Sequence, residues 1–170
     1  DHPLGMRGEH VHQLADVMLK KGLRFGFTAS SDSHGLLYHH GEARKRDPYR
    51  TGLTAVQAPA LTRDAVFEAL RTRRCYGTSG AKILLDMRVD GEPMGSTLRR
   101  SGPVTVSARA HGESSVARLE LITRDGVVAS AEGNGRDAQL EAEVTADYVY
   151  ARVVQHDGEM AWASPVFIDA

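Results

Sequence analysis

The hydrophobic period of the chain changes near residue 82, and this change constrains the fold more than any other feature of the sequence. Beyond that point, apolar residues alternate with polar ones in successive short runs, as in Val104, Val106 and Ala108. Asp-Gly pairs and other turn signals separate the runs at intervals of about ten residues. Six or seven short strands of this kind predict an antiparallel β-sandwich of immunoglobulin-like size over residues 82–170.

The first half of the chain has the mixed pattern of an α/β unit. Apolar residues at helical spacing predict a helix over residues 9–21, and an apolar run predicts a buried strand over residues 23–29. A second short strand is expected at residues 53–56. Thr62 has the side chain of a helix N-cap, and the helix after it would end at a basic run.

The distribution of charge follows the same division. Residues 1–85 carry 13 basic and 8 acidic side chains, a net charge of +5, whereas residues 86–170 carry 8 basic and 14 acidic ones, a net charge of −6. We therefore expect two units, residues 1–81 and residues 82–170.

The overall composition excludes several classes of protein. The formal net charge of −1 lacks the basic surplus of a dedicated nucleic-acid binder. No apolar run approaches the roughly 20 residues that a membrane-spanning helix needs, so we expect no membrane partner. A single cysteine, Cys75, excludes an internal disulfide and a cysteine-rich zinc site. The compartment, whether cytoplasmic, periplasmic or secreted, stays open, as does the oligomeric state.

Asp32-Ser33-His34 is the strongest candidate for chemistry. The motif follows the predicted strand over residues 23–29, and ligands of α/β proteins gather beyond the carboxyl ends of strands. In an extended backbone, residues i and i+2 point the same way, so the carboxylate of Asp32 and the imidazole of His34 would converge. This pair suits zinc, manganese or iron. The alternative is that Asp32 caps a helix N-terminus or forms an Asx-turn, with a surface histidine beside it.

Four segments of the chain resemble one known family, in the right order. The stretch Arg24–His34 (RFGFTASSDSH) resembles the last metal-binding motif of the PHP superfamily, named for polymerase and histidinol phosphatase. Thr51–Arg63 (TGLTAVQA…LTR) and Phe67–Gly80 (FEALRTRRCYGTSG) look like the end of the branch that carries a C-terminal β-sandwich. Tyr148–Ile168 is similar to the terminal strands of that branch.

This resemblance implies an α/β plus all-β protein: the C-terminal end of a PHP-type (β/α) barrel over residues 1–81, followed by an accessory immunoglobulin-like β-sandwich. Such enzymes are metal-dependent hydrolases that cleave phosphoesters with a metal-activated water. Asp32 and His34 would be two of the metal ligands, and the others would precede Asp1. The chain alone would then be a fragment that is inactive or binds metal weakly.

Other histidines have simpler interpretations. His10 and His12 form a His-x-His pair, but on the predicted helix over residues 9–21 their side chains diverge, so we expect ordinary helix residues. His39 and His40 lie in the loop after the motif, where they could contact metal or substrate or simply face solvent.

Arg73 and Arg74 are candidate contacts for a small anionic or phosphorylated substrate, although cations are also favoured at the end of a helix for electrostatic reasons alone. The residues between Gly77 and Gly80 are expected to form a hinge between the two units. The alternative function is a non-catalytic β-sandwich that serves as a binding or structural module, with an inactive α/β remnant.

Overall fold

The structure is a computed structural model that describes residues 15–30 and 51–170. Six histidine and aspartate residues singled out above lie outside the described residues: His10, His12, Asp32, His34, His39 and His40. Of the helix predicted over residues 9–21, the described part is helical from 15 to 20.

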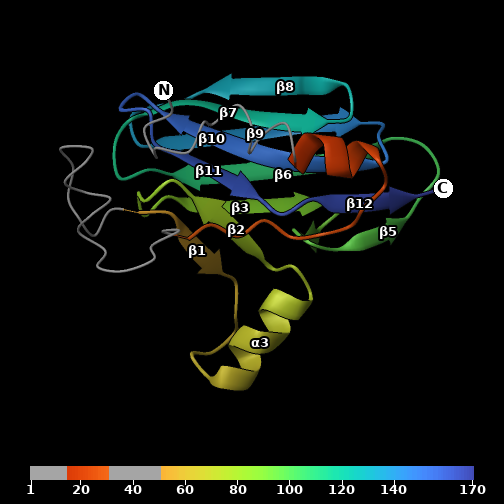
Figure 1. The fold of residues 1–170 in the computed structure, drawn as a ribbon. Coiled ribbons are helices and arrows are strands. Elements are labelled where there is room, and N and C mark those ends of the chain that lie inside the picture. The colour runs from red at the N-terminus through yellow and green to blue at the C-terminus, as the bar shows by residue number, and fades with distance from the viewer. Residues whose placement is uncertain (1–14, 31–50) are drawn as a thin grey trace.

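Two β-sheets pack face to face, and both are antiparallel except for one parallel pair, β5 with β12 (Figure 1). The larger sheet has the order β1-β2-β11-β10-β12-β5, with β7 paired to β10 and β8 to β7. Its eight strands are β1 (Leu53–Val56), β2 (Cys75–Thr78), β5 (Thr97–Arg99), β7 (Val116–Thr123), β8 (Gly126–Glu132), β10 (Tyr148–Gln155), β11 (Met160–Ala163) and β12 (Val166–Asp169).

The smaller sheet has the order β4-β3-β6-β9. Its strands are β3 (Leu84–Val89), β4 (Glu92–Pro93), β6 (Val104–His111) and β9 (Asp137–Val144). Alternate residues of these strands, such as Met87 and Val106, are buried against the larger sheet, as the alternation in the sequence predicts. The antiparallel β-sandwich expected from the second half of the chain is therefore present, with ten strands after residue 82.

The larger sheet is buried on both faces along β10. Val149, Ala151 and Val153 face the sandwich core, whereas Tyr148 and Tyr150 lie on the outer face. On that outer face, Tyr148 packs with Leu19 and with phenylalanines from the N-terminal segment and β12. A strand covered on both sides contributes more apolar burial than a strand with one solvated face.

The one described helix outside residues 15–20 is α3 (Arg63–Arg71), which begins as the sequence predicts. The hydroxyl of Thr62 accepts a hydrogen bond from the backbone N–H of Ala65, which is the geometry of an N-cap. Figure 1 shows this helix standing away from the sandwich. Only Ala69 of its apolar residues is fully buried.

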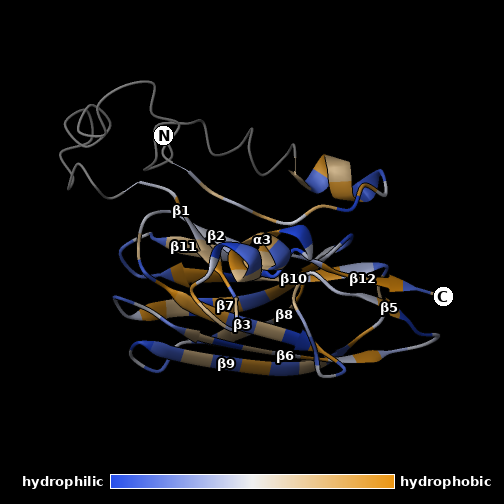
Figure 2. Ribbon diagram, turned by 90° about the horizontal axis from the view of Figure 1, so that it is seen from below, coloured by the Kyte–Doolittle hydropathy of each residue, from blue (hydrophilic) through white to orange (hydrophobic). Residues whose placement is uncertain are grey.

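Residues 15–30 run across the outer face of the larger sheet, on the side opposite β6 and β9 (Figure 2). Among the described residues, the buried strand predicted over residues 23–29 does not form. The segment pairs with no described strand, and the side chain of Leu23 is 50% exposed. The physical reason is that hydroxyl groups, not a neighbouring strand, take the hydrogen bonds of its inner backbone groups.

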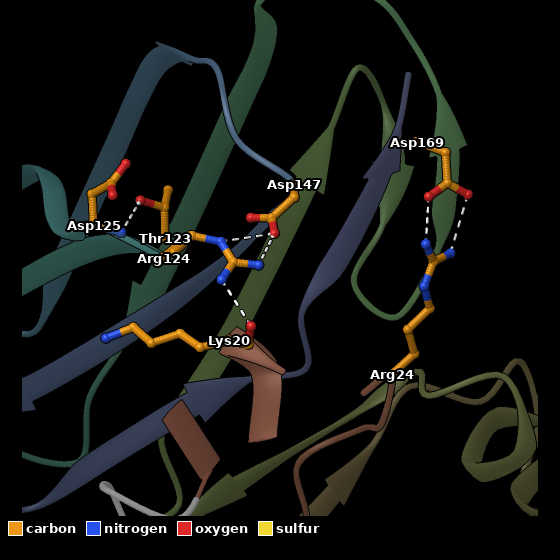
Figure 3. Close-up of polar contacts among 7 residues, drawn as sticks. All are labelled: Lys20, Arg24, Thr123, Arg124, Asp125, Asp147 and Asp169. Atoms are coloured by element: carbon orange, nitrogen blue, oxygen red, sulfur yellow. Dashed lines mark hydrogen bonds and ion pairs between the residues drawn. The ribbon is translucent and has the colours of Figure 1, made fainter. Parts of the chain in front are cut away.

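Two arginine–aspartate pairs fasten this segment to the sandwich (Figure 3). The guanidinium of Arg24 pairs with both carboxylate oxygens of Asp169 on β12, and this contact lowers the pKa of Asp169. Arg124 pairs with Asp147 and also donates to the backbone carbonyl of Lys20 at 2.8 Å. The pairs lie near the surface, so they hold the segment in register more than they stabilise the fold.

The larger sheet continues across the boundary expected between residues 81 and 82. β2 pairs with β11 from the other end of the chain, with Gly77 opposite Trp162. The hinge expected between Gly77 and Gly80 is wrong, because these residues are buried and the N–H of Ser79 donates to the carbonyl of Met160 at 2.9 Å. Where the boundary between two domains lies stays a prediction.

Candidate functional site

The backbone that leads into Asp32 is held in place by one hydroxyl group. Oγ1 of Thr54 on β1 donates to the carbonyl of Ala29 at 2.7 Å and accepts from the N–H of Ala29 at 3.0 Å. The backbone of Ser30 then lies against Gly52, where a Cβ would come within 2.6 Å of the Ser30 carbonyl oxygen. Only glycine fits at position 52. Residues 30 and 52 therefore meet at the base of the segment that carries the predicted metal ligands.

A second anchor lies two residues earlier, at Phe27. The N–H of Phe27 donates to Oγ of Ser164 at 2.8 Å, and the thiol of Cys75 contacts the Phe27 carbonyl at 3.6 Å. Cys75 is buried, and burial raises the pKa of its thiol. This favours the neutral form of the thiol.

The other edge of this segment has no partner in the part of the chain that the structure describes. Successive residues of an extended chain direct their backbone groups to opposite sides, and Phe27 and Ala29 use the side toward the sandwich. The backbone groups of Gly26 and Thr28 make no hydrogen bond with another described residue. Toward the described residues, the segment therefore leaves unpaired backbone groups a few positions before Asp32 in the sequence.

No group of three or more potential metal ligands occurs among residues 15–30 and 51–170. His111 pairs with Asp137 at 2.8 Å on the surface, and His156 is exposed. The described residues thus offer no substitute for the candidate ligands Asp32 and His34, which lie outside them together with His39 and His40.

Arg73 has a backbone conformation that is unusual for its residue type. Its φ is +60°, and it follows α3 at the position where helices usually place glycine. The N–H of Arg73 donates to the carbonyl of Leu70, and the N–H of Arg74 donates to that of Ala69. This pair of bonds is the Schellman motif, and the left-handed conformation costs a non-glycine residue about 1–2 kcal/mol.

The side chain of Arg73 offsets part of that cost. Its Nε donates to the carbonyl of Gly95 at 2.9 Å, and its guanidinium lies 5.6 Å from the ring centre of Phe167. Arg24 lies 5.4 Å from the same ring. Of the two arginines proposed from the sequence as substrate contacts, Arg73 thus uses its side chain for contacts within the protein, whereas Arg74 is exposed.

Both arginines line one cleft between the C-terminal end of α3 and β5, with a volume of about 580 Å³. Sequence reasoning missed the other wall of this cleft, because β5 and the turn before it lie more than twenty residues away along the chain. The lining residues are Arg71, Thr72, Arg73, Arg74, Glu92, Gly95, Ser96, Thr97, Leu98 and Arg99.

A buried carboxylate on the outer face of the larger sheet was also missed. Glu120 is only 6% exposed, and it accepts hydrogen bonds from Nε of Arg118 at 2.8 Å and Nε of Arg152 at 2.7 Å. Burial alone would raise its pKa, but the bonds and charges of Arg152 and Arg118 outweigh burial and lower it. The alternation of β7 indicates that Glu120 faces outward, but not that two arginines cover it.

Tyr148 is a further buried polar group. Its hydroxyl is buried without a hydrogen-bond partner among the described residues. Burial, followed by the charges of Asp16 and Asp147, raises its pKa to about 12. The ring packs among aromatic side chains, so Tyr148 serves the packing of the N-terminal segment.

None of the described helices combines the length and the apolar composition needed to cross a bilayer.

Comparison with known proteins gives matches of unknown function. Residues 40–91 match a family described as "Protein of unknown function (DUF3604)". A protein of Chlamydia trachomatis is 33% identical over 173 residues, and one of Chlamydia muridarum is 31% identical over the same length. Both are described as uncharacterized, and both alignments cover 89% of this chain. The chain spans 28% of the length of these curated relatives.

Part of this chain aligns with a known β-rich module among solved structures. The fibronectin(III)-like modules of Clostridium thermocellum CbhA align with a TM-score of 0.33 and 18% identity. The alignment covers 49% of this chain and 94% of that one.

Proposed function

We propose that this chain forms the C-terminal part of a metal-dependent phosphoesterase of PHP type. In this proposal, the segment up to about residue 81 completes a (β/α) barrel, and the sandwich is an accessory domain. Asp32 and His34 hold a divalent metal. The observation that carries the proposal is that the backbone groups of Gly26 and Thr28 make no hydrogen bond with another described residue, because a neighbouring barrel strand would supply the partners that such groups need.

The donor set fits such a metal. A carboxylate and an imidazole are ligands that zinc, manganese and iron accept. Two side chains are fewer than the three or four protein ligands that a zinc ion usually has, so further ligands must come from outside the described residues. That requirement agrees with a chain that spans 28% of the length of its curated relatives.

Each part of the chain then has a defined task. Thr54 and Gly52 position the backbone of residues 29 and 30, so that Asp32 and His34 start from a rigid base. The net charge of +5 on residues 1–85 favours the approach of an anionic phosphoester. When bound, the metal would supply Lewis-acid stabilisation of phosphoryl charge and activation of water.

The test uses the longer protein that contains this chain. We expect the purified protein to contain zinc, manganese or iron and to hydrolyse p-nitrophenyl phosphate. Asp32→Ala and His34→Ala should each reduce the metal content and lower kcat by about a hundredfold or more. His156→Ala is the matched control, because His156 is an exposed histidine on the sandwich. Unchanged metal content and activity in both ligand variants, with thermal stability retained, would exclude the proposal.

One observation favours the alternative, a non-catalytic module that packs against another part of a longer protein. The side chains of Leu61 and Phe67 are 98% and 66% exposed, and Leu70 of α3 is also exposed. Exposed apolar side chains grouped on one element are typical of a contact surface. If this role is the whole function, Phe67→Ser should weaken the packing of the longer protein, while the protein binds no metal and hydrolyses no phosphoester.

A further inference from the structure

The cleft between α3 and β5 has an excess of positive charge. Four arginines line it, whereas Glu92 is the one carboxylate among its lining residues. Glu68, outside the cleft, neutralises Arg71 through two hydrogen bonds of 2.8 Å. Arg73 binds a neutral carbonyl, so its charge stays uncompensated.

The remaining two guanidinium groups, those of Arg74 and Arg99, are exposed and form no hydrogen bond or salt bridge with another described residue. Each interacts with one carboxylate, Arg74 with Glu68 and Arg99 with Asp169, and both carboxylates are already hydrogen-bonded to another arginine. The two arginines come from opposite walls, one at the end of α3 and one at the end of β5. An anion between these walls would relieve the repulsion among the arginines.

The two walls are held together before any ligand binds. Gly95 packs so closely on the turn after α3 that a Cβ there would overlap the carbonyl of Arg73 and lie 2.7 Å from that of Thr72. The bond from Arg73 to the Gly95 carbonyl joins the same two segments. A preformed cleft costs less ordering when a ligand binds than a cleft that must assemble.

We propose that this basic cleft binds the phosphate group of a small phosphorylated molecule. Guanidinium groups match phosphate oxygens with two parallel hydrogen bonds, which a single point charge cannot do. Oγ1 of Thr97 accepts a bond from Arg73, so its own proton can be donated to a phosphate oxygen. The volume of about 580 Å³ exceeds that of phosphate alone, so the cleft has room for a sugar-sized remainder that contacts both polar side chains and Leu98.

This proposal does not depend on the metal site, because its test uses the longer protein after a chelator has removed any metal. Titration calorimetry at low ionic strength should detect saturable binding of inorganic phosphate and of ribose 5-phosphate, the latter at least as tight. Arg74→Gln and Arg99→Gln should each weaken both ligands by about tenfold. Both side chains are exposed, so these variants should unfold at the temperature of the unmodified chain.

Arg136→Gln provides the control. Arg136 is exposed beside Asp137, at the opposite end of the smaller sheet from Glu92, and its loss should leave both affinities unchanged. Equal weakening by Arg136→Gln would indicate diffuse attraction of anions and overturn the proposal, as would the absence of saturable binding. Binding of inorganic phosphate but not of ribose 5-phosphate would overturn the assignment to a phosphorylated molecule.

Discussion

Arg73 is the residue at which local conformation and long-range packing conflict. Its left-handed backbone disfavours any residue other than glycine, and yet its side chain connects the end of α3 with Gly95 and Phe167. A glycine at position 73 would remove the backbone strain, but it would also remove the side-chain contacts with Gly95 and Phe167. Residues in strained conformations are often retained where the side chain has a task that glycine cannot perform.

We expect Gly95→Ala to lower the free energy of unfolding by about 2–4 kcal/mol, since the new Cβ would be both strained and overlapped by the backbone of residues 72 and 73. Gly91→Ala is a matched control, because Gly91 has the same φ of +85° with nothing within 4 Å of the added carbon. Its cost should be about 1–2 kcal/mol. Urea unfolding measures the free energy of unfolding of both variants. An equal decrease in the two would contradict the close contact of Gly95 with residues 72 and 73.

Glu120 predicts a dependence of stability on pH. Its folded-state pKa is lowered, so its contribution is complete above the ordinary pKa of about 4.5 and is lost as the pH falls through the lower folded-state value. Glu120→Gln should cost about 1–3 kcal/mol at pH 7, because it leaves Arg118 and Arg152 without their charged partner.

The difference between Glu120→Gln and the unmodified chain should then narrow toward pH 3, as followed by chemical unfolding at several pH values. Glu141→Gln removes an exposed carboxylate from β9 and should leave the pH dependence as it is. A constant difference across this range would mean that the pKa of Glu120 does not change on folding.

At the scale of elements, residues 24–30 depend on hydroxyl groups from β1 and from the turn between β11 and β12. Thr54→Val keeps the shape of the side chain and removes the group that bonds both the N–H and the carbonyl of Ala29. We expect amide exchange of residues 27–30 to accelerate at least tenfold, with a loss of global stability of about 1–2 kcal/mol.

Thr105→Val is the control for this substitution, since Thr105 is an exposed threonine in β6 whose hydroxyl is not needed by another described segment. Exchange at residues 27–30 that is equally slow in Thr54→Val and Thr105→Val would show that Thr54 is not the anchor. In the longer protein, the loosened base should also weaken metal binding, because Asp32 and His34 follow directly.

The elements that were predicted well from the sequence are those whose structure depends on local pattern. The alternation at Val104 and Val106 predicts a strand, and the N-cap at Thr62 predicts the start of α3, because each signal lies within a few residues. The apolar run after residue 22 forms no buried strand among the described residues. Its phenylalanines pack on the outer face of β10, and its backbone bonds to hydroxyl groups far along the chain. No local pattern in the sequence contains this information.

At the scale of the whole molecule, the chain is a β-sandwich with an N-terminal portion spread over one face and a helix that projects from it. The sheet joins residues from both halves of the sequence, so the change of hydrophobic period near residue 82 does not mark a break in hydrogen bonding. The candidate metal site stays a prediction from a motif, because Asp32 and His34 lie outside the described residues.

The central claim is that Asp32 and His34 bind a metal, and anomalous diffraction from crystals of the longer protein tests it most directly. Data collected at the absorption edges of zinc, manganese and iron should show a peak about 2.0–2.2 Å from a carboxylate oxygen of Asp32 and a ring nitrogen of His34. A metal-loaded crystal in which every anomalous peak lies away from these two side chains would contradict the account.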